Sequence, residues 1–219
     1  MSYYTRWSLV IGSSFFQRFL QENYEKGIAD LQLLERKTPF SQQNFSCLLC
    51  GVGNAETARS FIQCVIRKNP LAHIYIIDLG SEQIREVKKL VTRDFSQYDV
   101  TVRQMNALEL LSWLKNSSLD WIETDGFLEF FSPSQLQQLL KIWHILLKDD
   151  GFITIRETAS NSSIGSCIDV LRIWVAKHWL GVQLHTYTLK DLKKTFHAIG
   201  FRFVSFPTIV PTFRRFTMI

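Results

Sequence analysis

Apolar residues are distributed along the chain in two alternating patterns. Short continuous apolar runs, typical of strands buried on both faces of a sheet, are separated by stretches with an apolar residue at every third or fourth position, typical of amphipathic helices. The runs predict strands at residues 45–50, 73–78, 100–105, 119–124 and 152–156. The stretches between them predict helices at residues 54–67, after Ser81, at about 107–115 and after Pro133. This alternation predicts an α/β fold with a doubly wound, mostly parallel sheet.

Helix boundaries and flanking segments refine this picture. Ser132-Pro133-Ser134-Gln135 is a strong helix start, because serine can cap the N-terminus, proline fits the first position and glutamine can close a capping box. Residues 13–37 have helical spacing and stop at Thr38-Pro39. After the fifth strand, helices are predicted at residues 167–180 and 188–199. Extended runs at residues 201–209 and 213–219 then predict a C-terminal antiparallel hairpin.

Composition limits the class of protein. The chain has 219 residues, 46% of them hydrophobic and 13% aromatic, which suffices for one domain with a substantial core. No apolar run approaches the roughly 18 residues that span a bilayer, and the first residues lack the apolar segment of a signal peptide, so a cytoplasmic protein without a membrane span is expected. The net charge is +5, but basic residues such as Lys88, Lys89 and Arg93 alternate with apolar ones. This favours solvated helix faces over nucleic-acid binding.

The segment Cys50-Gly51-Val52-Gly53 lies between the first predicted strand and the next helix. Glycines in such a turn let a ligand approach the backbone, and the helix N-terminus offers free N–H groups. Dinucleotide-binding turns need Gly or Ala three residues after the second glycine, where this chain has Glu56. Ala55 supplies a small residue one step earlier. The turn therefore favours a ligand without a phosphate at this point.

Polar residues also follow the other predicted strands. Asp78 ends the second strand, where an acid can accept both hydroxyls of a ribose, and Asn106 follows the third, where an amide can bond an adenine edge. Asp125 and Glu157 follow the fourth and fifth strands. The carboxyl ends of parallel strands meet at one edge of a sheet, so these side chains are expected at a common site.

Together these residues resemble the class I S-adenosylmethionine-dependent methyltransferase family, over residues 45–158 and more loosely to the C-terminus. The resemblance implies a Rossmann-like methyltransferase fold and S-adenosyl-L-methionine as cofactor. It also implies a cofactor site formed by Cys50, Gly51, Val52, Gly53, Asp78, Leu79, Asn106, Ala107 and Thr124. One departure is Leu49, because the family usually carries an acid two residues before the first glycine.

The resemblance also suggests how the chain is divided. It implies an N-terminal helical lid at residues 1–40, with Tyr3 and Tyr4 over the site, and a Rossmann-like cofactor-binding and catalytic domain at 41–219. A substrate cap is expected as an insertion at about 159–187, where His185 and Tyr187 would line the pocket. The alternative for both segments is that they simply bury the sheet.

Asp125 and Glu157 are the candidate catalytic residues, as a base or as anchors for the substrate. The alternative is that they are ordinary loop acids, paired with Arg156 or a helix N-terminus. The expected activity is transfer of the methyl group of S-adenosylmethionine to an oxygen or nitrogen of a small molecule. Two alternatives stay open, which are transfer of an aminopropyl-type group from the same cofactor and a non-catalytic partner subunit that binds it.

Metal and redox chemistry are not expected. Cys47 and Cys50 form a Cys-x-x-Cys pair, but residues three apart on a strand face opposite sides of the sheet. No second pair completes a metal site. The sequence therefore predicts structural cysteines and no bound metal.

Overall fold

The computed structural model describes residues 14–159, 183–210 and 212–219, and all structural statements concern these residues. Tyr3, Tyr4, the helix expected at 167–180 and most of the cap expected at 159–187 lie outside them. The helices are α2 (Ser14–Ala29), α3 (Ala55–Lys68), α4 (Ser81–Asp94), α5 (Pro133–Leu146) and α7 (Leu189–Ile199), with 3-10 helices η2 (Asp30–Leu34), η3 (Pro39–Ser41), η4 (Ala107–Ser112) and η5 (Leu128–Phe130). The strands are β1 (Ser46–Cys50), β2 (His73–Asp78), β3 (Val100–Gln104), β4 (Leu119–Asp125), β5 (Leu147–Thr158), β6 (Phe203–Pro207) and β7 (Phe213–Met218).

The seven strands form one sheet in the order β3-β2-β1-β4-β5-β7-β6. The five strands β1 to β5 pair in parallel, whereas β7 pairs antiparallel with both β5 and β6. The prediction of a doubly wound, mostly parallel sheet that ends in an antiparallel hairpin is therefore confirmed. The last strand of the chain lies between β5 and β6, so the hairpin attaches to the sheet through its second strand.

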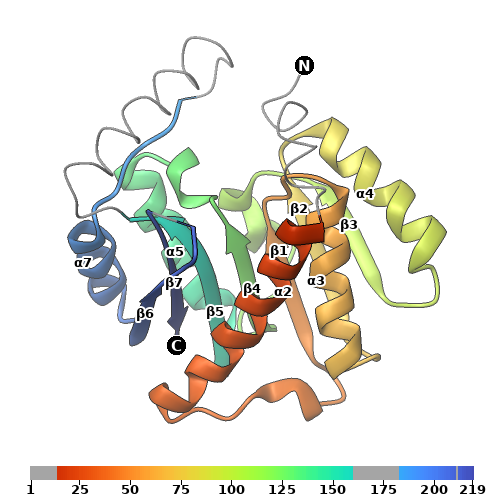
Figure 1. Cartoon of the computed structure of the whole chain (residues 1–219), viewed down its shortest axis with the longest axis horizontal. Coiled ribbons are helices and arrows are strands. Elements are labelled where there is room, and N and C mark those ends of the chain that lie inside the picture. Colours follow the sequence, from red (N-terminus) through yellow and green to blue (C-terminus); the bar gives the residue numbers. More distant parts are fainter. Residues whose placement is uncertain (1–13, 160–182, 211) are drawn as a thin grey trace.

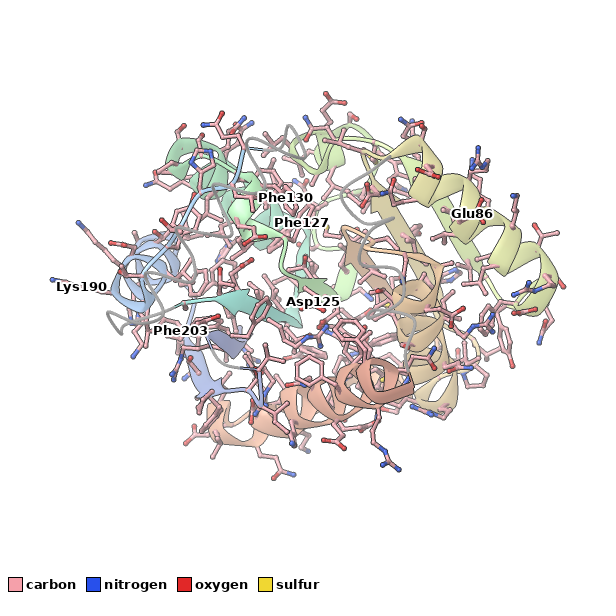
Figure 2. The ribbon with its side chains drawn as sticks, turned by 45° about the horizontal axis from the view of Figure 1, so that its top comes forward. Glu86, Asp125, Phe127, Phe130, Lys190 and Phe203 are labelled. Atoms are coloured by element: carbon pink, nitrogen blue, oxygen red, sulfur yellow. The ribbon has the colours of Figure 1, made fainter. Side chains whose placement is uncertain are left out.

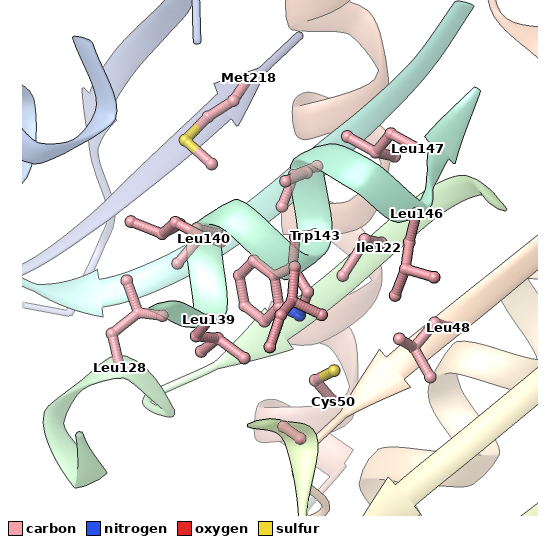
Figure 3. Packing of buried hydrophobic residues seen from close by; sticks show 14 of the residues in the cluster. Leu48, Cys50, Ile122, Leu128, Leu139, Leu140, Trp143, Leu146, Leu147 and Met218 are labelled. Atoms are coloured by element: carbon pink, nitrogen blue, oxygen red, sulfur yellow. The ribbon is translucent and has the colours of Figure 1, made fainter. Parts of the chain in front are cut away.

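Helices cover both faces of the sheet (Figure 1), and buried side chains form an apolar layer on each face. Buried residues of α2, α3 and α4 form one layer, and those of α5, α7 and η4 form the other. Strand alternation divides β1 between them, because Cys47 and Leu49 belong to the first layer and Leu48 and Cys50 to the second. Figure 3 shows Cys50 beside Trp143 of α5 in the second layer. The predicted opposite orientation of Cys47 and Cys50 is confirmed, and both are buried free thiols.

Local sequence signals account for most boundaries. The Ser132 side chain accepts from the Gln135 amide and the Gln135 side chain accepts from the Ser132 amide, so the predicted capping box forms. The sequence favours Ser81 as the N-cap of α4, but Ser81 is the first residue of the helix and Gly80 is the cap. The fifth strand is longer than predicted and begins at Leu147, which pairs with Leu119. Four residues of β5 but only one of β4 separate this pair from the next pair, Trp121 and Phe152, so β5 carries an irregularity there.

The N-terminal helix is part of the protein core. Leu20 and Tyr24 of α2 are fully buried against the sheet. After α2, Asp30 pairs with Arg215 of β7 at 2.8 Å (Nε–Oδ2) and 3.2 Å (Nη2–Oδ1). Residues 14–34 therefore cover one face of the sheet, and closure of the site by the residues before them stays a prediction.

Candidate functional site

The candidate site lies at the edge of the sheet where the five parallel strands have their carboxyl ends. Strand order reverses at β1, which lies between β2 and β4. In open α/β sheets, ligands bind beyond the strand ends at such a switch point. The glycine turn follows β1, with Asp78 on one side of it at the end of β2 and Asp125 on the other at the end of β4.

The glycine turn has a conformation that requires glycine at its first position. Gly51 has φ +79°, a left-handed value, and its amide donates to the Ile77 carbonyl at 3.0 Å. A Cβ on Gly51 would lie 2.4 Å from a ring carbon of Phe127. The missing side chain therefore lets Phe127, from the segment after β4, pack directly over the turn.

The helix after the turn begins with an ordered cap. The Asn54 side chain accepts from the Thr57 amide at 2.9 Å. The Glu56 carboxylate pairs with Arg59 of α3 and Gln17 of α2, each at 3.1 Å. The acid that argues against a dinucleotide therefore belongs to the contact between α2 and α3.

Asp78 links the ends of β1 and β2. Its carboxylate accepts from the Val52 amide at 2.7 Å and from the Gly80 amide at 2.6 Å. Burial raises the pKa of Asp78, and these backbone donors oppose the rise. An ionised carboxylate accepts about four hydrogen bonds, so acceptor sites remain for a ligand. Leu79 beside it is 66% exposed and offers an apolar surface at the same edge.

Asn106 begins η4 as its cap. Its side-chain oxygen accepts from the Leu108 amide at 3.0 Å, so its NH₂ group is the part that can donate to a ligand. Ala107, the first residue of η4, is buried.

Cys50 and Thr124 are buried residues that support the glycine turn from the interior of the sheet. The Thr124 hydroxyl donates to the Cys50 carbonyl at 2.7 Å, which ties the end of β1 to β4. Both side chains are completely buried, and burial raises the pKa of the Cys50 thiol above its usual value. Because they are buried, Cys50 and Thr124 stabilise the turn and do not line an open site.

Asp125 and Glu157 lie at the same edge of the sheet but on opposite faces. Asp125 pairs in register with Arg156 and contacts its guanidinium at 3.1 Å. Glu157 is the next residue of β5 and therefore points to the other face. There its two oxygens accept from the Leu128 amide at 2.7 Å and the Thr158 amide at 2.9 Å. The structure thus separates the two acids that the sequence places together, and Glu157 anchors the start of η5.

A buried charge cluster lies beneath Asp125. The pairing of Asp125 with Arg156 is the alternative that the sequence left open, whereas the part played by Glu123 was not anticipated. Arg156 contacts both Asp125 and Glu123, the latter at 3.3 Å, and its guanidinium lies 4.9 Å from the centre of the Tyr24 ring. Glu123 pairs in register with Leu49, the position where the resembled family has an acid. A buried acid is therefore present one strand away from the expected place. The sequence signal that could have revealed the cluster is that Glu123 and Arg156 lie within strands predicted to be buried, with Asp125 directly after one of them.

The other missed residues lie between β4 and α5. Figure 2 shows Asp125, Phe127 and Phe130 near one another around the end of β4. The chain returns to this segment at residues 185–187, where the His185 amide donates to the Glu129 carbonyl at 2.7 Å. The Tyr187 hydroxyl donates to the Phe131 carbonyl at 2.5 Å, and burial with the nearby Glu157 raises the pKa of Tyr187 to about 12. The structure therefore brings His185 and Tyr187 to the segment after β4.

The described residues contain no group of three or more His, Cys, Asp or Glu side chains suited to hold a metal ion. None of the helices in the described ranges combines the length and apolar character needed to cross a bilayer.

Comparison with known proteins shows which solved structures have a similar fold. The chain matches no protein-family model, and a search of curated proteins gives no match. Solved structures match strongly. An S-adenosylmethionine-dependent methyltransferase from Leishmania major aligns with a TM-score of 0.66 and 15% identity, over 97% of this chain and 77% of that one. Mitomycin 7-O-methyltransferase aligns at 0.61 and 15% identity, over 96% of this chain and 62% of that one.

A third similar structure is a methyltransferase from Methanosarcina mazei, with a TM-score of 0.59, 16% identity, and coverage of 84% of this chain and 97% of that one. The chain has the class I S-adenosylmethionine-dependent methyltransferase fold. In this methyltransferase fold, the edge that carries Gly51, Asp78 and Asp125 is the candidate site.

Proposed function

We propose that the protein is a methyltransferase that moves the methyl group of S-adenosylmethionine to an oxygen or nitrogen of a small molecule. The observation that carries this proposal is the contact between Asp78 and the turn at Gly51–Gly53. It joins two strand ends at the switch point of a methyltransferase fold and leaves acceptor oxygens at the edge.

The residues at this edge fit the parts of the cofactor. A ribose would bond to Asp78, an adenine ring would lie against Leu79, and the NH₂ group of Asn106 would donate to a ring nitrogen. The methionine part would lie along the turn at Gly53, beside the Phe127 ring that packs over Gly51. Because the cofactor carries positive charge and no phosphate, the acids Asp78 and Asp125 complement it.

An acceptor would enter on the side of the segment after β4. Phe127 and Phe130 are only partly buried and Tyr187 lies against the same segment, which favours an apolar or aromatic small molecule. The bound cofactor supplies an activated methyl group, so the protein contributes mainly positioning. Glu157 would take part by fixing η5, and its role as a base stays a prediction. The residues before Ser14 and the cap expected at about 159–187 would close the site as lid and cap.

Leu79 provides a clean test of the cofactor site, because its side chain is 66% exposed. Leu79→Ala removes apolar contact with adenine and should weaken S-adenosylmethionine binding about fivefold to tenfold, as a loss of roughly 1 kcal/mol implies. Leu71 is the matched control, since it is 70% exposed and precedes the opposite end of β2. Calorimetry on both variants measures the effect. Equal affinity in the two variants would remove Leu79 from the site.

A thermal-shift panel tests the choice of cofactor. S-adenosylmethionine and its demethylated product should each raise the melting temperature, whereas NAD and NADP should not. A ligand at 100 times its dissociation constant adds about 2.7 kcal/mol of stability. A shift with NAD alone would favour a reductase and contradict the proposal.

A further inference from the structure

The charge cluster beneath Asp125 contains one cation and two acids. Arg156 is 2% exposed and contacts Glu123 at 3.3 Å and Asp125 at 3.1 Å. Glu123 is 1% exposed, whereas the Asp125 side chain is 17% exposed at the edge of the sheet. The cluster therefore reaches from the interior to the proposed cofactor site.

The cluster is electrically balanced when one of its acids carries a proton. Two ionised carboxylates beside one guanidinium would leave an uncompensated negative charge in an apolar layer, which is costly. Asp125 reaches solvent at the edge of the sheet and lies closer to Arg156 than the fully enclosed Glu123 does. The proton belongs on Glu123, whose pKa burial raises to about 8 although Arg156 and the Thr154 hydroxyl oppose the rise.

The groups around Glu123 come from four elements. They are Asp125 on its own strand, Arg156 and Thr154 on β5, Tyr24 on α2 and the Cys64 thiol on α3. Only Arg156 among them carries a positive charge. Any change in the pairing of Arg156 therefore acts directly on Glu123.

We propose that Asp125 binds the positively charged methionine end of the methyl donor, and that Glu123 then gives up a proton to solvent. This inference rests on the function proposed above. A cation at Asp125 competes with Arg156 for that carboxylate, so more of the guanidinium charge is available to Glu123. One O–H bond of Glu123 breaks, its proton passes to bulk water, and the resulting carboxylate pairs with Arg156. Glu123 and Arg156 are thus positioning residues.

The proposal predicts that binding of the donor strengthens as pH rises. Because a proton is released on binding, the dissociation constant should fall by up to about tenfold per pH unit around neutrality. Glu123→Gln has no proton to release and should bind with the affinity that the parent shows at low pH. The α-ammonium of the ligand titrates alike against both proteins, so the ratio of their dissociation constants isolates Glu123.

Titration calorimetry tests this in buffers of different ionisation enthalpy at pH 7, with affinities measured from pH 6 to 9. The parent protein should release a substantial fraction of one proton on binding S-adenosylmethionine, and Glu123→Gln much less. Glu22→Gln, on an exposed position of α2, should behave as the parent. Release with the demethylated product as well assigns Asp125 to the ammonium, and release with the donor alone assigns it to the sulfonium.

Asp125→Asn, at a partly exposed position, is the second variant. It should bind the donor at least tenfold more weakly and release no proton. Equal proton release by the parent and Glu123→Gln would overturn the inference and leave the proposed function standing. Absence of any binding to the parent would overturn both.

Discussion

The carboxylate of Asp78 accepts a hydrogen bond from the backbone amide of Val52, with 2.7 Å between Oδ2 and N. Asp78 ends β2 and Val52 belongs to the glycine turn after β1. The acid predicted to hold a ribose therefore also holds the turn. Its variants will change protein stability as well as ligand affinity, so the two must be measured separately.

Asp78→Asn should lower the free energy of unfolding by about 1–3 kcal/mol. An asparagine can accept from only one of the two backbone amides, and its NH₂ group faces the other. Denaturant unfolding measures the loss, with Asp149→Asn at an exposed position of β5 as the control. Calorimetry should show weaker S-adenosylmethionine binding in the folded Asp78 variant. Parent-like stability would contradict the role of Asp78 in holding the turn.

Gly51→Ala should be more destabilising than Gly126→Ala. Both glycines have positive φ, but a Cβ on Gly51 would lie 2.4 Å from the Phe127 ring, whereas the nearest atom to one on Gly126 is 3.9 Å away. We expect a loss of roughly 1 kcal/mol from backbone strain at each position and an added steric loss only at Gly51. Adding Phe127→Ala to Gly51→Ala should recover the steric part. A double-mutant cycle with no coupling energy would show that the packing of the Phe127 ring does not require glycine at position 51.

Glu157→Gln should lower stability by about 1–3 kcal/mol, because the amide cannot accept at both positions that now receive backbone N–H groups. Thermal unfolding measures this, and Glu109→Gln on the exposed side of η4 should change little. Once a substrate is known, the turnover of Glu157→Gln should also fall, because the variant loses a hydrogen bond that orders η5. Unchanged stability together with a loss of turnover of 10²-fold or more would instead identify Glu157 as a base.

Glu123→Gln should change how stability depends on pH. The pKa of Glu123 is about 8 in the folded protein and 4.5 ordinarily, so its favourable contribution is complete below pH 4.5 and is lost as the pH rises through 8. A glutamine stays neutral throughout. As the pH rises from 5 to 8, the free energy of unfolding of the variant should therefore increase relative to that of the parent by on the order of 1–3 kcal/mol. A constant difference over this range would mean that Glu123 is ionised throughout.

Much of the fold could be predicted because its signals are local. Apolar runs and helical spacing identify β1 to β4 and α3 to within a residue or two, since each pattern is contained in a few neighbouring residues. The capping box at Ser132 likewise depends on four consecutive positions. The edge that carries Gly51, Asp78 and Asp125 follows from these elements, because parallel strands bring their carboxyl ends together.

The sequence by itself determined the α/β alternation, the glycine turn and the polar residues at the strand ends. Only the tertiary structure decided that Asp125 and Glu157 point to opposite faces, that Phe127 packs over Gly51, and that Arg156 lies between two acids. The physical reason is register. The neighbours of a buried side chain come from strands and helices far away in sequence, and a shift of one residue in strand pairing would turn every side chain to the other face.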